Sequence, residues 1–191
     1  MFKSRKTKSI IVLALGAAVT LLNFVTMGGN GFHISLWTIL DTLINVLLAL
    51  ALFFRAKGRK LPAVICAVSY PTVLAVGYIV DIVTSGSLTP QVLAEALTMG
   101  FAAILILYAA NIGRAEHRWL WMILALALNV TYFFAYRLIL SAFYAIPLDH
   151  VFNARSFFVN LLLWALIALG FWPLRPDCDA VSGTPTASRG A

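Results

Sequence analysis

Six long apolar segments dominate the sequence, and each is long enough to cross a bilayer as a helix. They are separated by short polar gaps and lie at about residues 10–27, 34–54, 61–83, 90–112, 119–144 and 151–172. A membrane-spanning helix needs about 20 mostly apolar residues, because the hydrocarbon core of a bilayer is about 30 Å thick. With 62% apolar and only 11% charged residues, the composition excludes an ordinary soluble domain and a disordered chain. We therefore predict an all-α, polytopic membrane protein with a bundle of six transmembrane helices.

The positive charges lie in the gaps between the apolar segments, and their distribution predicts an orientation. Lys and Arg precede the first segment, separate the second from the third and the fourth from the fifth, and follow the sixth. The alternate gaps, residues 28–33, 84–89 and 145–150, contain neither residue type. Because cytoplasmic loops are enriched in Lys and Arg, both termini are predicted to be cytoplasmic. The same pattern is typical of a multi-pass protein of the cytoplasmic (inner) cell membrane.

The net charge of +7 is explained by this topology, so the expected partner is the lipid bilayer and not a nucleic acid. Residues 1–172 are predicted to form a single six-helix transmembrane domain. Residues 173–191 are rich in Pro, Gly, Ser, Thr and Ala and have little to bury. That composition predicts a flexible cytoplasmic tail.

Polar residues inside the predicted spans concentrate in the half of each helix nearer the outer side of the membrane. The other halves, such as residues 46–54, 101–110 and 161–171, are almost entirely apolar. In several helices the polar residues recur every three or four positions and so share one face. Because a charged side chain near the bilayer centre costs about 2.5–3.5 kcal/mol, these faces should point into the bundle. The candidate substrate-binding residues are Asp41, Asn45, Asp81, Glu95, Asn129, Tyr132, Tyr136, Arg137, Arg155 and Asn160.

Asp41 is the strongest single candidate among these residues. It lies roughly 10 Å inside the second predicted span, at a helical rise of about 1.5 Å per residue, and one turn before Asn45. Since buried charges are usually paired, we predict an ion pair between Asp41 and Arg137 across the bundle. Two alternatives stay open: Arg137 and Arg155 could extend to the outer headgroups, or the ion pair could be purely structural.

The sequence contains no HExxH, CxxC or GxSxG motif, so we expect no cofactor and no nucleophilic catalysis. Three outer loop residues, His33, Asp149 and His150, could meet at the mouth of the bundle. Asp41 or Asp81 would complete a cation site there, which leaves a metal possible in principle. The polarity that every outer loop needs explains these residues more simply.

The polar residues in the outer half of each predicted span favour a function in binding. We expect a small integral membrane protein with an outward-facing polar cavity that captures or transports a small polar or ionic solute. The alternative is an accessory or structural subunit of a larger membrane complex, in which partner membrane subunits satisfy the polar faces. The third hypothesis is a membrane-embedded enzyme acting on an outer-leaflet lipid, with Asp41 or Asp81 as base and Arg137 holding the headgroup.

Overall fold

The computed structural model describes residues 4–27, 36–85, 92–111 and 118–173, which form α-helices and no strand. Five of the helices are long and apolar enough to cross a membrane, namely α1, α2, α3, α5 and α7. These residues confirm an all-α chain, and the apolar helices indicate a multi-pass membrane protein. In chain order the helices are α1 (Arg5–Met27), α2 (Leu36–Ala56), α3 (Lys60–Ser85), α4 (Val92–Ala110), α5 (Arg118–Tyr144), α6 (Leu148–Val151) and α7 (Ala154–Phe171).

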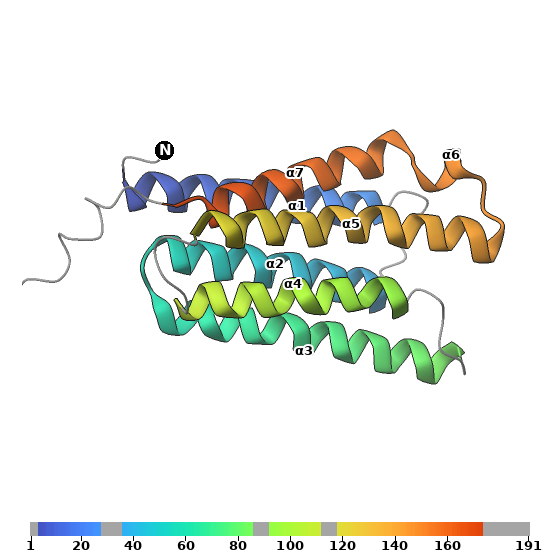
Figure 1. Cartoon of the computed structure of the whole chain (residues 1–191), viewed down its shortest axis with the longest axis horizontal. Coiled ribbons are helices and arrows are strands. Elements are labelled where there is room, and N and C mark those ends of the chain that lie inside the picture. Colours follow the sequence, from blue (N-terminus) through green and yellow to red (C-terminus); the bar gives the residue numbers. More distant parts are fainter. Residues whose placement is uncertain (1–3, 28–35, 86–91, 112–117, 174–191) are drawn as a thin grey trace, which may run out of the picture.

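Helix α4 corresponds to the predicted span at residues 90–112. Its apolar segment, Ala94–Ala110, is shorter than the segments of the other five long helices. It lies beside α3 and α5 and is aligned with them along the bundle (Figure 1). The residues that flank α4, 86–91 and 112–117, lie outside the described part of the chain. A sixth membrane crossing therefore stays a prediction.

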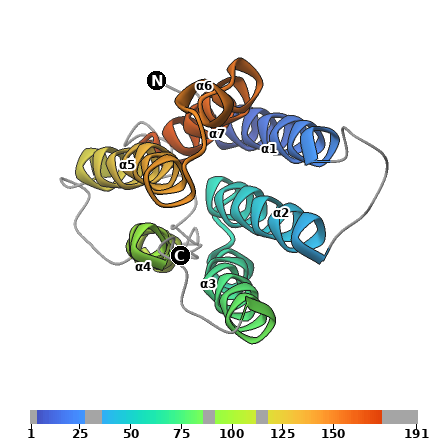
Figure 2. The same cartoon turned by 90° about the vertical axis from the view of Figure 1, so that its right-hand side faces the viewer.

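The long helices form a closed ring. Seen from one end, α1, α2, α3, α4, α5 and α7 follow one another around it (Figure 2). Each helix contacts its neighbours in this order, α7 closes the ring against α1, and α2 also reaches α4 and α7. Successive long helices run in opposite directions, so α1 begins where α7 ends (Figure 1). We call that end of the bundle the Lys8 end, and the opposite end, which carries α6, the α6 end.

The hydrophobic core lies mainly in the Lys8 half of the bundle, as the distribution of apolar residues predicts. Large apolar side chains on the outer surface, such as Leu13, Ile65 and Leu161, are exposed, and a bilayer would cover them. The core therefore seals the half of the bundle opposite α6. Its buried members are Val12, Val19, Leu48, Ala49, Ala51, Leu52, Ala63, Ala67, Tyr70, Phe101, Ala102, Ile104, Leu105, Ala109, Ala125, Leu166, Ile167 and Phe171.

Helix α1 begins earlier than the predicted start near residue 10, because Ser4 caps it. The Ser4 Oγ accepts a hydrogen bond from the Thr7 backbone N–H at 3.1 Å, which satisfies one of the free donors of the first turn. The first turns of α1 therefore carry the N-terminal cations, and Lys8 is only 2% exposed.

Tyr108 links four helices at the Lys8 end. Its hydroxyl donates to the Gly170 carbonyl oxygen at 2.9 Å and accepts from Lys8 Nζ at 3.4 Å. Its carbonyl oxygen accepts from Arg55 Nε at 3.0 Å, and Lys8 Nζ also donates to the Trp172 carbonyl oxygen at 2.7 Å. The Trp172 carbonyl oxygen and the Tyr108 phenol thus accept hydrogen bonds from the buried ammonium group, and the four bonds together connect α1, α2, α4 and α7.

The turn between α2 and α3 is fixed by Gly58, whose φ is 78°. Its N–H donates to the Arg55 carbonyl at 3.0 Å, and the next N–H, of Arg59, donates to the Phe54 carbonyl at 2.9 Å. This pair of bonds is the Schellman motif, which needs a left-handed residue and so favours glycine. The basic gap between the second and third predicted spans is therefore a tight turn.

Two glycines allow α2 to pack closely against its neighbours. A Cβ atom at Gly16 of α1 would collide with Ala49 of α2, and one at Gly170 of α7 would lie 2.6 Å from Leu52 Cδ1. By contrast, a Cβ at Gly100 of α4 would lie 3.4 Å from the nearest side-chain atom, the edge of ordinary contact.

We predict that Gly16→Ala destabilises the protein, because the new methyl group forces α1 away from α2. The expected loss is about 1–3 kcal/mol of unfolding free energy, the usual range for overpacking. Gly100→Ala is the matched control and should cost less than Gly16→Ala. Denaturant titration of the detergent-solubilised protein measures both, and equal stability of the two variants would contradict the close contact between α1 and α2.

Candidate functional site

The charged residues of the predicted site fall into two groups of opposite sign. Arg137 and Arg155 lie at the α6 end, where α1, α5 and α7 meet. Asp41 of α2 and Glu95 of α4 lie within electrostatic range of each other. Asp81 belongs to α3, but its side chain lies outside the described part of the structure. The predicted single site is therefore divided between two places in the bundle.

Arg137 connects three helices through its guanidinium group. Its Nε donates to the Val151 carbonyl oxygen of α6 at 3.1 Å, and Nη1 donates to the Phe133 carbonyl oxygen of α5 at 3.4 Å. Its Nη2 donates to Ser156 Oγ of α7. The guanidinium carbon lies 3.7 Å from the centroid of the Phe133 ring, a cation–π contact. Three of the five N–H donors of this arginine are thus engaged, and the side chain is held in place.

The predicted ion pair between Asp41 and Arg137 is wrong. Arg137 is within electrostatic range of Tyr132 and Tyr136, and no described carboxylate is near it. The physical reason is that Arg137 extends from α5 toward α6 and α7, where main-chain carbonyls and Ser156 accept its hydrogen bonds. Asp41 is on α2, and its electrostatic neighbours belong to α3, α4 and α5.

The last predicted span, residues 151–172, is interrupted near its start. The short helix α6 ends at Val151, and α7 begins at Ala154. Asn153 separates them in an extended conformation (φ −82°, ψ 149°), and its side-chain oxygen accepts from the Ser156 N–H at 2.7 Å. Asn is a favoured N-cap residue, because its side chain replaces a missing helical hydrogen bond. This cap fixes the first turn of α7 beside Arg137.

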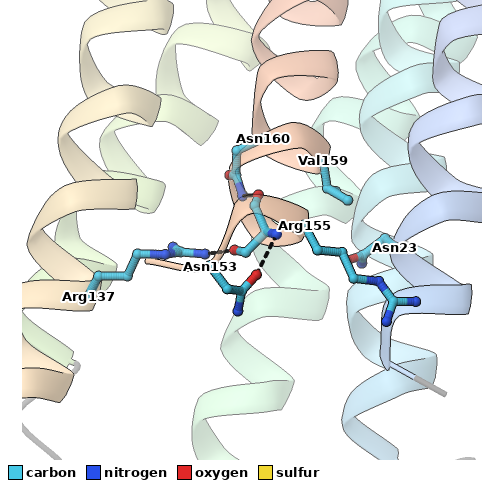
Figure 3. A pocket seen from close by; sticks show the side chains of 7 residues that line it. Asn23, Arg137, Asn153, Arg155, Val159 and Asn160 are labelled. Atoms are coloured by element: carbon cyan, nitrogen blue, oxygen red, sulfur yellow. Dashed lines mark hydrogen bonds between the residues drawn. The ribbon is translucent and has the colours of Figure 1, made fainter. Parts of the chain in front are cut away.

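A pocket of about 480 Å³ opens at this first turn of α7 (Figure 3). Its described lining combines two guanidinium groups, three side-chain amides and one hydroxyl, and it includes no carboxylate. The lining residues are Asn23, Arg137, Asn153, Arg155, Ser156, Val159 and Asn160.

The two arginines enter the pocket region from different helices. Arg137 reaches Ser156 from α5, whereas Arg155 extends from α7 toward α1 and Asn23 (Figure 3). Arg155 is exposed, and its Nη2 donates to the Val25 carbonyl oxygen of α1 at 3.1 Å. Most of its N–H donors are therefore not engaged by the described residues, and the positive end of the α7 dipole adds to the positive potential here.

Asp41 and Glu95 lie among tyrosines on the other side of the bundle. Both carboxylates are half-buried, and both are within electrostatic range of Tyr70 on α3 and of Tyr132 on α5. The rings of Tyr132 and Tyr136 are 5.6 Å apart, and both hydroxyls are in electrostatic range of Arg137. Tyr132 is thus within electrostatic range both of the two carboxylates and of Arg137.

The three asparagines of the predicted site all form hydrogen bonds within the bundle, two of them to main-chain carbonyls of their own helices. Asn45 Nδ2 donates to the Asp41 carbonyl oxygen and Asn160 Nδ2 to the Ser156 carbonyl oxygen, each at 2.9 Å. Asn129, which is 8% exposed, accepts at Oδ1 from Trp164 Nε1 at 3.0 Å. Of the three, only Asn160 lines the pocket.

Four polar residues of these two groups were not among the predicted candidates: Asn23, Asn153 and Ser156 in the pocket, and Tyr70 near the carboxylates. Asn153 had a usable signal, because an Asn just before an apolar helical run is a typical N-cap. Asn23 and Ser156 are polar residues in the outer halves of their predicted spans, which was a usable signal as well, whereas only the packing of α3 places Tyr70.

The described residues contain no group of three or more His, Cys, Asp or Glu side chains that could hold a metal ion. In α6, Asp149 accepts at Oδ1 from the adjacent His150 N–H at 3.1 Å. His33, the third residue of the predicted loop site, lies outside the described residues, as does the Asp81 side chain. That cation site stays a prediction.

Comparisons with models of known protein families, with curated proteins and with solved structures find no match for this chain.

We predict that Arg137 couples energetically to Ser156 and not to Asp41. In a double-mutant cycle, Arg137→Gln and Ser156→Ala should be non-additive by about 0.5–3 kcal/mol of unfolding free energy, because they remove the same hydrogen bond. Arg137→Gln and Asp41→Asn should be additive, since the two groups do not meet. Coupling in the second cycle with additivity in the first would overturn the described position of Arg137.

Proposed function

We propose that this chain is a six-span membrane protein that captures a phosphate group from the side opposite its basic loops. The group belongs either to a free phosphorylated solute or to a lipid headgroup. The observation that carries the proposal is the lining of the α6-end pocket, which includes Arg137, Arg155 and no described carboxylate. The planar guanidinium group of arginine presents paired N–H donors that match the geometry of phosphate oxygens. Charge-assisted hydrogen bonds from arginine to phosphate are among the strongest in proteins.

The surroundings of the pocket support an anion as its ligand. The first turn of α7 presents free main-chain N–H groups and the positive end of the helix dipole, a common setting for phosphate. The side-chain amides of Asn153 and Asn160 offer further hydrogen-bonding groups at the rim. Because Arg137 is already held by α5, α6 and α7, little conformational entropy is lost when a ligand binds it.

The membrane orientation supports capture from outside. The Lys8 end carries Arg5, Lys6, Lys57 and Lys60, and basic loops of this kind favour the cytoplasmic side. The pocket lies at the other end, and the apolar core fills the half of the bundle beneath it. With a cytoplasmic Lys8 end, the pocket would face the outside of the cell.

Binding is a better account of the pocket than catalysis. An enzyme acting on an outer-leaflet lipid needs a base beside the headgroup, and the described lining offers no carboxylate or histidine for that role. The pocket lining therefore favours the capture of an ionic solute over the enzyme hypothesis. An accessory subunit, whose pocket is covered by a partner chain, is the remaining alternative.

Phosphate binding to the full-length protein in detergent tests the proposal. We expect inorganic phosphate, titrated at constant ionic strength, to bind saturably in calorimetry and to raise the unfolding temperature. Arg155→Gln should weaken binding by roughly tenfold to a hundredfold, since a charge-assisted hydrogen bond contributes about 1.5–3 kcal/mol. Lys57→Gln, which removes a cation at the Lys8 end, is the matched control and should leave the affinity unchanged.

A second arm distinguishes the two sources of the phosphate group. Protein in nanodiscs of phosphatidylcholine, with and without phosphatidylglycerol, is analysed by native mass spectrometry for retained lipid. Retention of phosphatidylglycerol that Arg155→Gln abolishes indicates a headgroup, whereas binding of free phosphate alone indicates a solute. If neither is bound, or if Lys57→Gln matters as much as Arg155→Gln, the proposal is wrong and an accessory subunit becomes the better hypothesis.

A further inference from the structure

The α6-end pocket lies at the ends of two apolar spans, and this depth narrows the class of ligand. The apolar span of α1 ends at Val25, and that of α7 begins at Ala154. Arg155 lines the pocket, and its Nη2 donates to the Val25 carbonyl oxygen at 3.1 Å. Because apolar spans end where hydrocarbon meets the headgroups, a phosphate group bound at Arg155 would lie level with the phosphates of the bilayer.

We propose that the pocket binds the headgroup of a phospholipid whose headgroup alcohol carries hydroxyl groups and no ammonium group, as in phosphatidylglycerol. This inference rests on the proposed function and deepens it. It selects a lipid over a free solute as the source of the phosphate, and one class of headgroup among the lipids.

Exposed apolar side chains beside the pocket provide surface for the acyl chains. On α1, Leu21 and Val25 are 65% and 59% exposed. On α7, which packs against α1, Phe158 and Leu161 are 54% and 47% exposed. Phe158 lies one helical turn beyond Arg155. A lipid held at Arg155 therefore finds apolar surface for its chains directly beside its headgroup, which a free solute does not need.

The charges of the pocket disfavour an ammonium group on the bound headgroup. The described lining contains the guanidinium groups of Arg137 and Arg155 and no carboxylate (Figure 3). The described residues engage three N–H donors of Arg137 and one of Arg155, which leaves donors of both for phosphate oxygens. The ammonium group of phosphatidylethanolamine would find no carboxylate in this lining, and both arginines would repel it.

The amide groups of the pocket suit a hydroxylated alcohol. Asn153 uses Oδ1 to accept from the Ser156 N–H at 2.7 Å, and Asn160 uses Nδ2 to donate to the Ser156 carbonyl oxygen at 2.9 Å. Asn153 Nδ2 and Asn160 Oδ1 hydrogen-bond to no described residue, and both side chains line the pocket. A free donor and a free acceptor match hydroxyl groups, which both donate and accept. The glycerol headgroup of phosphatidylglycerol offers two of them.

Native mass spectrometry of the full-length protein in nanodiscs tests the inference. The nanodiscs contain phosphatidylethanolamine and phosphatidylglycerol in equal amounts and with identical acyl chains. We expect phosphatidylglycerol to be retained about tenfold more than phosphatidylethanolamine, because only its headgroup avoids repulsion by the arginines. Glycerophosphoglycerol, the same headgroup without acyl chains, should fail to displace it. Equal retention of the two lipids, or displacement by glycerophosphoglycerol, overturns the inference.

Asn160→Leu tests the contact with the headgroup alcohol, since it removes the open amide oxygen and keeps both arginines. It should lower the retention of phosphatidylglycerol by about twofold to tenfold, the effect of one lost hydrogen bond. Asn45→Leu is the matched control, because Asn45 Nδ2 also donates to a carbonyl oxygen of its own helix at 2.9 Å but lies outside the pocket lining. It should retain the lipid like the wild type, and equal retention by the two variants would contradict the proposed contact.

Failure of this inference can be distinguished from failure of the proposed function. If inorganic phosphate binds and Arg155→Gln weakens its binding, while the two lipids are retained equally, the inference is wrong and the phosphate site stands. If the wild-type protein binds neither inorganic phosphate nor either lipid, both are wrong.

Discussion

The cost of placing charged and polar groups in hydrocarbon is the constraint on which this structure depends. Each half-buried ionisable side chain must find a partner inside the bundle, reach water at one end or lose its charge. Lys8 finds the Trp172 carbonyl and the Tyr108 hydroxyl, and Arg137 finds the carbonyls of α5 and α6. The acceptors include main-chain oxygens at the ends of α6 and α7, Val151 O and Trp172 O, which are not used by the helices themselves. Free carbonyl groups at helix ends thus help to bury both cations.

The same constraint explains why the two halves of the bundle differ. In the Lys8 half, apolar side chains pack closely. Because Gly16 has no side chain, α1 can lie directly against α2, and little room is left for a ligand. In the α6 half, the extended residue Asn153 interrupts the helix between α6 and α7. Residues of the first turn of α7 line the pocket there. Tyr132 is within electrostatic range both of Arg137 in the basic pocket and of the two carboxylates. The proposed anion site follows from this division.

The sequence predicted the general architecture well, because apolar length and the periodicity of polar residues are local properties. The helical class, the apolar Lys8 half and the approximate bounds of α2, α3 and α5 agree with the structure. The candidate site was predicted only as a set of residues. Depth along a helix suggested that Asp41 and Arg137 should meet, but the ring order of the helices directs them to different neighbours. Tertiary order of this kind cannot be obtained from the spacing of residues in single helices.

The central claim is that the α6 half of the bundle is open to solution at its end, whereas the Lys8 half is sealed. Thiol accessibility in intact cells tests it most directly, after Cys66 and Cys178 are replaced by Ala. Matched cysteines are placed on α2 at Asn45 and Leu48 and on α7 at Asn160 and Leu166, and a membrane-impermeant maleimide is added outside. The account predicts labelling of Asn45→Cys and Asn160→Cys and protection of Leu48→Cys and Leu166→Cys, whose native side chains are 2% and 1% exposed. Equal protection of all four cysteines, or labelling only after the membrane is permeabilised, would contradict it.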